Sequence, residues 1–187
     1  VAAAMQSMRE GFYNPSSAYA ASIPVQREMD RCRAALLSAL STQGGRIVFT
    51  SGGTEGDNFA IGGAMRRRGA QSALCTCAEH PAVLHCARAY GAQEIPVGPD
   101  GTPDLEQFES AVRSAQGLGV VSAMLVNNET GAIFPVQEMA RIVKEHSDAL
   151  FHCDAVQGFL HVDMPNLRQI DLLSISGHKI HAPKGIG

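Results

Sequence analysis

From residue 46 onward, short apolar or β-branched runs alternate with longer segments whose hydrophobic residues recur at helical spacing. This alternation is typical of βα units, because parallel strands need crossover connections that are usually helices. The sequence therefore predicts an α/β fold: a three-layer sandwich with a mainly parallel mixed sheet. The expected strands span residues 46–50, 73–76, 93–97, 119–126, 149–153 and 171–174, and the expected helices span residues 27–40, 55–68, 81–90, 105–113 and 135–146.

Helix boundary signals support these assignments. Pro81 stands at the first position of one expected helix and Gly91 just past its end, and Asp104 can cap another helix. No repeat, linker or low-complexity tract divides residues 1–187, so we expect one domain. We expect this domain to be incomplete, because residues 184–187 read as the approach to a further strand.

Composition excludes several functional classes. A net charge of -3 and a pI near 6.2 give no reason to expect nucleic acid as a partner. No apolar run reaches the roughly 20 residues that span a bilayer, and the first residues lack a secretory signal pattern, so we expect no membrane and a cytoplasmic location. The five irregularly spaced cysteines predict a reducing compartment and no metal site, since Cys75 and Cys77 lack a second pair at zinc-site spacing.

Ser51, Gly52, Gly53 and Thr54 lie between an expected strand and an expected helix. Backbone N–H groups at a helix N-terminus can hold a phosphate, and the hydroxyl of Thr54 can add to them. The turn matches neither the dinucleotide nor the Walker pattern, and such a turn can also be an ordinary connection.

Asp154 and Lys179 both stand where expected strands end, at the edge where ligands bind in open α/β sheets. An aldehyde cofactor needs an amine for a Schiff base and a carboxylate that keeps its pyridine nitrogen protonated. The alternatives are a capping aspartate and a solvated lysine.

Four further polar residues have two readings each. His80 and His178 can act in proton transfer or contact a cofactor ring, or they can be loop histidines bonded to a backbone carbonyl. Asn128 and Gln157 are neutral donors suited to a phenolic oxygen, or they can satisfy turn backbone instead.

Together these segments closely resemble the cysteine desulfurases of the nitrogen-fixation and iron–sulfur-cluster type, within the class V aminotransferase-like family. The resemblance covers nearly the whole chain, and its blocks stand in the family's order and approximate spacing. The blocks are NPSS (14–17), FTSGGTEGDN (49–58), EH with AV (79–83), VNNETG (126–131), HCDAVQ (152–157) and DLLSISGHKIHAPKGIG (171–187).

The resemblance implies the large domain of a fold type I enzyme that uses pyridoxal 5'-phosphate (PLP). Lys179 matches the Schiff-base lysine, and Asp154 matches the partner of the pyridine nitrogen. His80 matches the ring-stacking histidine, which together with Lys179 would be catalytic. The other implied cofactor contacts are Gln157 at the phenolic oxygen, Asn128 near the ring and substrate, and Gly53, Thr54, Ser176 and His178 around the phosphate.

The implied reaction converts L-cysteine to L-alanine and leaves the sulfur on a protein cysteine as a persulfide. The implied partners are a sulfur-acceptor or scaffold protein of iron–sulfur assembly and a second copy of the chain in a homodimer. A selenocysteine lyase, another class V aminotransferase-like enzyme and a non-catalytic PLP-binding fragment remain alternatives. Tyr19 replaces a histidine that is common in the family after the NPSS turn.

The family's sulfur-accepting cysteine, its substrate-binding arginine, a phosphate contact from a partner subunit and its small C-terminal domain match no segment of these 187 residues. We therefore expect the chain alone to lack turnover.

Overall fold

The structure is a computed structural model that describes residues 2–42, 44–67 and 69–187. Two compact units divide it, Val1–Val48 and Phe49–Gly187. The sequence predicted one domain over residues 1–187, and the assignment of both units to a single domain stays a prediction.

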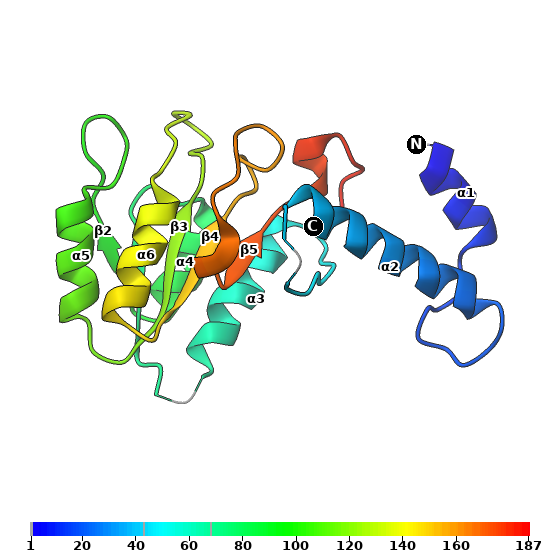
Figure 1. Cartoon of the computed structure of the whole chain (residues 1–187), viewed down its shortest axis with the longest axis horizontal. Helices are drawn as coiled ribbons and strands as arrows, with labels where there is room; N and C mark the ends of the chain where they lie inside the picture. The colour runs from blue at the N-terminus through cyan, green and yellow to red at the C-terminus, as the bar shows by residue number, and fades with distance from the viewer. Residues whose placement is uncertain (1, 43, 68) are drawn as a thin grey trace. The chain divides into compact units, whose positions relative to one another are not determined.

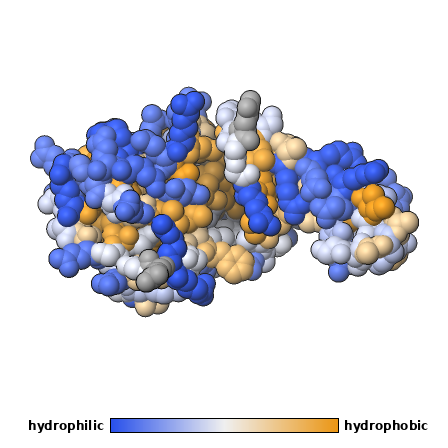
Figure 2. All heavy atoms as spheres, turned by 60° about the horizontal axis from the view of Figure 1, so that its bottom comes forward, coloured by the Kyte–Doolittle hydropathy of each residue, from blue (hydrophilic) through white to orange (hydrophobic). Residues whose placement is uncertain are grey.

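The first unit contains α1 (Ala2–Glu10) and α2 (Ser22–Ala39). The expected turn between them is present, since the Asn14 side chain accepts a hydrogen bond from the Ser16 N–H at 2.9 Å. Many hydrophobic side chains of this unit are exposed, and Figure 2 shows hydrophobic surface among the hydrophilic atoms. These exposed side chains are Met5, Met8, Phe12, Tyr19, Ile23 and Val48.

The second unit is built on a five-stranded sheet with strand order β2-β1-β3-β4-β5. All four strand pairings are parallel, so the sheet of the described residues is more regular than the mixed sheet that we expected. The three-layer α/β fold is confirmed. The strands are β1 (Ser72–Thr76), β2 (Gln93–Ile95), β3 (Leu118–Met124), β4 (Leu150–Asp154) and β5 (Leu172–Ser174).

Helices cover both faces of this sheet (Figure 1). On one face, α5 and α6 pack against each other and on the strands, and on the other face α3 and α4 do the same. The helices are α3 (Gly53–Met65), α4 (Pro81–Ala89), α5 (Leu105–Ser114) and α6 (Val136–His146), with short 3-10 turns η1 (Leu167–Gln169) and η2 (Gly177–Ile180).

The central strand β3 shows why a continuous apolar run is needed here. Val120 packs into the core under α3 and α4, whereas Val121 packs into the core under α5 and α6. A strand buried on both faces has no polar side to alternate with.

The Asp104 cap is also confirmed, since its carboxylate accepts hydrogen bonds from the N–H groups of Glu106 and Gln107 at 2.8 and 3.0 Å.

The expected strand over residues 46–50 is wrong. The backbone there forms no strand, and Thr50 exchanges backbone hydrogen bonds with Gly187 at 2.8 and 2.9 Å. A β-branched run defines a strand only where a neighbouring strand pairs with several of its residues.

α1 was not predicted, because none of its residues is buried and its sequence carries no core-facing stripe.

Candidate active site

The carboxyl ends of the parallel strands form one edge of the sheet, and a pocket lies there. The strand order reverses between β1 and β3, so the loops that follow these two strands diverge and leave a crevice, as at the switch points of other open α/β sheets. The pocket has a volume of about 220 Å³. This is below the roughly 300–1,000 Å³ of typical small-molecule sites, so it suits one substituted ring better than a dinucleotide.

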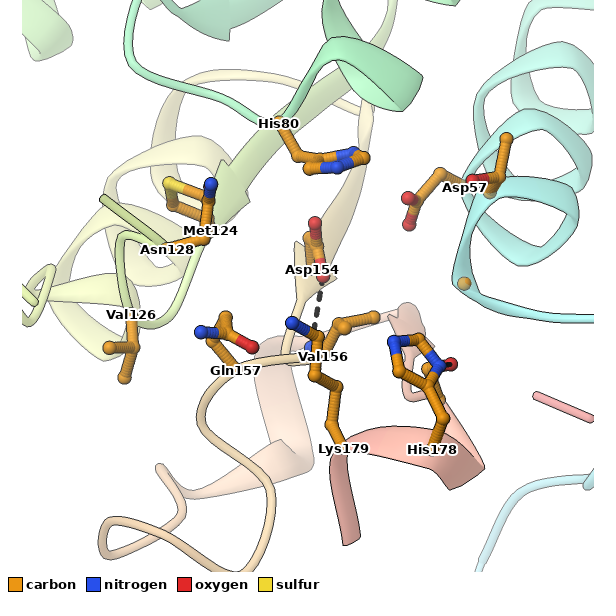
Figure 3. A pocket seen from close by; sticks show the side chains of 13 residues that line it. Asp57, His80, Met124, Val126, Asn128, Asp154, Val156, Gln157, His178 and Lys179 are labelled. Atoms are coloured by element: carbon orange, nitrogen blue, oxygen red, sulfur yellow. Dashed lines mark hydrogen bonds between the residues drawn. The ribbon is translucent and has the colours of Figure 1, made fainter. Parts of the chain in front are cut away.

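All nine sequence-predicted site residues line this single pocket (Figure 3). They come from five places along the chain, at the start of α3, before α4, after β3, after β4 and in η2. Their individual roles stay predictions. The nine residues are Gly53, Thr54, His80, Asn128, Asp154, Gln157, Ser176, His178 and Lys179.

Asp154 ends β4 and is 4% exposed. Desolvation raises the pKa of this carboxyl, while the Val156 N–H, which donates to Oδ1 at 2.9 Å, and the nearby His80 and Lys179 oppose that rise. A carboxylate held at the bottom of a pocket can accept a further N–H or pair with a ligand cation. In Figure 3 its side chain points into the space between His80 and Lys179.

His80 caps α4 with its ring. Its Nδ1 accepts a hydrogen bond from the Ala82 N–H at 3.1 Å, so Nδ1 carries no proton and the neutral ring has its proton on Nε2. The cap fixes the ring orientation while Nε2 stays available to the pocket. The ring is thus bonded to a backbone N–H rather than to the carbonyl that we considered, and its role at a cofactor stays a prediction.

Glu79, next to His80, is buried and connects two segments of the chain through hydrogen bonds. Its Oε1 accepts from the Thr76 hydroxyl at 2.6 Å and from the Met124 N–H at 3.0 Å, which joins the loop after β1 to the end of β3. Burial raises the pKa of this carboxyl to about 8. It is thus held uncharged at neutral pH, next to His80 in the sequence.

The loop after β3 is organised by Asn127 rather than Asn128. Its side-chain N–H donates to the Ala78 carbonyl at 2.9 Å, and its oxygen accepts from the N–H groups of Glu129 and Thr130 at 3.0 and 2.8 Å. Asn127 is 7% exposed, whereas Asn128 is exposed and lines the pocket. The backbone role that we considered for Asn128 belongs to its neighbour.

The turn that carries Lys179 is held from both sides. Ser176 Oγ lies 2.9 Å from His178 Nδ1, and the Nε2–H of His161 donates to the Lys179 carbonyl at 2.9 Å. Gly177 leaves room for a close approach, since an added Cβ would lie 2.8 Å from the side chain of Ile186. These contacts aim the lysine amine at the pocket.

The start of α3 lines the pocket at the place where we predicted a phosphate contact, and that role stays a prediction. No side chain caps this helix at Gly52, so its first N–H groups face the cavity lined by Gly53 and Thr54. An added Cβ on Gly53 would lie 2.8 Å from the side chain of Val156, another lining residue. The backbone can therefore approach a ligand closely at this point.

Four lining residues were not predicted from the sequence: Asp57, Met124, Val126 and Val156. Apolar residues carry no chemical signal that marks them as pocket wall. Asp57 did carry one, because it lies four residues before the buried Ile61 and therefore on the core-facing side of its helix, where a carboxylate is unusual.

The residues fit PLP. An uncapped helix N-terminus with Ser176 and His178 suits the phosphate, the buried Asp154 suits the ring nitrogen, and Lys179 suits the aldehyde. The chain has three lysines, and the other two are placed elsewhere: Lys144 is paired with Asp171 at 2.5 Å, and Lys184 is exposed outside the pocket.

Comparison with known proteins identifies the class of protein. The family model described as aminotransferase class-V matches residues 1–187, so the chain belongs to the class-V aminotransferase family.

The chain is similar to the cysteine desulfurase of Nostoc sp., with 38% identity, and to the cysteine desulfurase NifS of Azotobacter vinelandii, with 37% identity. Each alignment covers 100% of this chain and 48% of the relative. Among solved structures, a NifS-like protein superposes with a TM-score of 0.88 at 32% identity, over 98% of this chain and 52% of that one. A structure titled "SspA in complex with cysteine" superposes with a TM-score of 0.87 at 30% identity, over 100% and 56% of the two chains.

Proposed function

We propose that this chain is the cofactor-binding part of a PLP-dependent cysteine desulfurase, which converts L-cysteine to L-alanine and passes the sulfur to a protein cysteine. The observation that carries the proposal is the placement of Lys179 and the buried Asp154 in one pocket beside His80. The names of the relatives and the cysteine-bound structural neighbour support the reaction and the substrate.

When bound, PLP supplies a protonated pyridine ring that takes up electrons from bonds broken in an amino acid. Lys179 would hold its aldehyde carbon, and the free amine would carry a proton to and from the substrate. Asp154 would keep the ring nitrogen protonated, and its burial strengthens that pairing because little water screens it. Gly53, Thr54, Ser176 and His178 would hold the phosphate, and Gln157 and Asn128 would contact the ring substituents.

The chain spans about half the length of the curated relatives it matches. We propose that the working enzyme is a homodimer. The exposed hydrophobic side chains of Val1–Val48 support this proposal, because such side chains are typical of surfaces that contact another protein chain. We also propose a sulfur-acceptor or scaffold protein of iron–sulfur assembly as a partner. The five cysteines are all free, which supports our proposal of a reducing, cytoplasmic location.

Two other findings concern membrane-spanning helices and metal-binding sites, neither of which we propose for this chain. None of the described helices is long and apolar enough to cross a membrane. Within residues 2–42, 44–67 and 69–187, no group of three or more His, Cys, Asp or Glu side chains could hold a metal ion.

Covalent labelling tests the cofactor site. The chain is incubated with PLP, reduced with borohydride, digested and analysed by mass spectrometry. We expect the pyridoxyl label on Lys179, because it is the lysine that lines the pocket. Lys179→Ala should lose the label, and the matched variant Lys184→Ala should keep it. Equal labelling of Lys144 and Lys184, or no label after reduction, would contradict the proposal.

A further inference from the structure

A second carboxyl group, Asp57, faces the same pocket, and the proposed function gives it no role. It lies on α3, is 1% exposed and points toward Asp154 and His80 (Figure 3). Its Oδ1 is buried and has no hydrogen-bond partner among the described residues. A buried, unpaired carboxylate is costly, so this group needs either a cation or a proton.

A hydrogen-bond chain runs through the sheet directly behind Asp57. The fully buried His152 of β4 lies with Nδ1 2.8 Å from Ser122 Oγ of β3 and with Nε2 2.9 Å from Ser174 Oγ of β5. The Ser174 hydroxyl acts on Asp57 as a hydrogen-bond donor. The polar side chains of three adjacent strands thus form one hydrogen-bond chain from Ser122 through His152 to Ser174, and Asp57 lies beside it.

His152 does not supply the missing cation. Its Nε2 lies 3.6 Å from Asp57 Oδ1, which is too long for a hydrogen bond. Burial lowers the pKa of the imidazole to about 4, so the ring is neutral at neutral pH. Two buried groups at this distance are more stable as a neutral pair than as ions, because both charged forms would lose their hydration.

The other groups around Asp57 also leave it without a positive partner. β4 presents Asp154 and Cys153, and β3 and β5 present serine hydroxyls. Glu79 faces it from the loop before α4, and Cys86 faces it from α4. Three side chains of the pocket can carry positive charge: His80 and Lys179 act on Asp154, and His178 is hydrogen-bonded to Ser176 Oγ. Burial first, and then the charge of Asp154, raise the pKa of Asp57 to about 8.

We propose that Asp57 is a positioning residue that keeps its proton and thereby leaves the single negative charge of the pocket on Asp154. This rests on the proposed function, in which Asp154 pairs with the ring nitrogen of PLP. Two carboxyls that share a site do not both ionise readily, and the pair titrates as one unit. Asp154 has His80, Lys179 and a backbone N–H to stabilise its charge. Asp57 has a buried Oδ1 with no hydrogen-bond partner among the described residues, and the nearest groups behind it, the Ser174 hydroxyl and the neutral His152 ring, carry no charge.

Carboxyl-carbon NMR of the 187-residue chain tests the charge assignment without cofactor. Aspartate is labelled with 13C, and the Asp57 signal is assigned by sequential triple-resonance experiments. We expect Asp57 to stay protonated through neutral pH and to titrate at lower pH in Asp154→Asn, because the neighbouring charge is then gone. An Asp57 signal that is already that of a carboxylate near pH 6, or one that Asp154→Asn does not move, would overturn the proposal.

PLP affinity gives the second measurement. Asp57→Asn keeps a neutral side chain that donates hydrogen bonds, so its Kd should stay within about threefold of that of the unchanged chain, while Asp154→Asn should weaken binding by about tenfold or more. The exposed Asp163→Asn is the matched control. If Asp57→Asn weakens binding as much as Asp154→Asn does, the charge lies on Asp57 and the proposal is wrong. If the unchanged chain binds no PLP, the proposed function fails, and the NMR titration still decides the protonation of Asp57.

Discussion

Asp57 at the pocket and Glu79 in the loop before α4 are buried carboxyl groups without a cation beside them. Glu79 is 4% exposed, accepts two hydrogen bonds on Oε1 and has no partner for Oε2 among the described residues. Its raised pKa means that the folded chain holds a proton that the unfolded chain releases. Glu79 therefore links the pocket wall to the pH dependence of folding.

Glu79→Gln should make the stability of the chain less dependent on pH. The folded-state pKa of Glu79 is raised from 4.5 to about 8, so its stabilising contribution is complete below pH 4.5 and is lost as the pH rises toward 8. Glutamine keeps the acceptor oxygen and cannot ionise. We expect the fall in unfolding free energy across this window to be smaller in the variant by about 1–3 kcal/mol, measured by urea denaturation at its two ends.

The exposed Glu129→Gln is the control for this measurement and should behave like the unchanged chain. Asp57 and Asp154 also have raised pKa values, so the variant should flatten the pH profile without abolishing its slope. An unchanged slope in Glu79→Gln would mean that the carboxyl is already ionised in the folded chain.

Among the secondary-structure elements, α3 contributes most directly to the pocket, because its first turn and its core-facing side both line it. Its first residue, Gly53, packs so closely against Val156 that a side chain has no room, whereas Gly63 on the same helix has no atom within 4 Å of an added Cβ. The two glycines therefore separate the effect of helix propensity from the effect of crowding at the pocket.

Gly53→Ala should weaken PLP binding, because its methyl group would push Val156, and with it the turn that follows Asp154. Overpacking of this kind costs about 1–3 kcal/mol. Gly63→Ala should leave the Kd unchanged and stabilise the helix by about 0.5–1 kcal/mol, since alanine loses less backbone entropy than glycine. Fluorescence titration with PLP and thermal unfolding measure the two effects, and equal PLP affinity in both variants would count against the close approach at Gly53.

Most helices and strands of the second unit could be predicted, because their hydrophobic period and their caps are local properties of the sequence. The helix at Pro81 and the Asp104 cap are examples. The strand over residues 46–50 could not be judged locally, since a strand depends on a neighbour that pairs with it. In the site, nine lining residues could be predicted from polar residues at strand ends and from the family resemblance. Met124, Val126 and Val156 could not, because apolar residues of these types are common in protein cores and only the fold brings them to the pocket.

At the scale of the whole molecule, the pocket gathers the nine residues predicted to hold the cofactor but no sulfur acceptor among the described residues. None of the described residues that line it is a cysteine. Cys75 and Cys153 are buried, and burial raises the pKa of Cys75 to about 12 and that of Cys153 well above its usual value. Both thiols are therefore held protonated, and a protonated thiol is a poor nucleophile.

We expect the 187-residue chain to bind PLP without sustained release of alanine from L-cysteine. Sulfur transfer requires a thiolate at bonding distance from the substrate sulfur, and the pocket presents none. Alanine is measured by chromatography after incubation with PLP and L-cysteine, with Lys179→Ala as the background. Continued turnover that Lys179→Ala abolishes would show that these residues suffice for the reaction.

The five segments that meet at the pocket lie between residue 53 and residue 179 and are brought together by the parallel sheet. Pairings this distant in sequence form late in folding, because the entropy of closing long loops must be overcome first. A partly folded intermediate with a single βα unit would hold at most a fragment of the pocket wall. Binding of the cofactor during refolding would therefore show that the last strands of the sheet have paired. A ligand that binds only the fully folded chain would shift the folding equilibrium toward the native state.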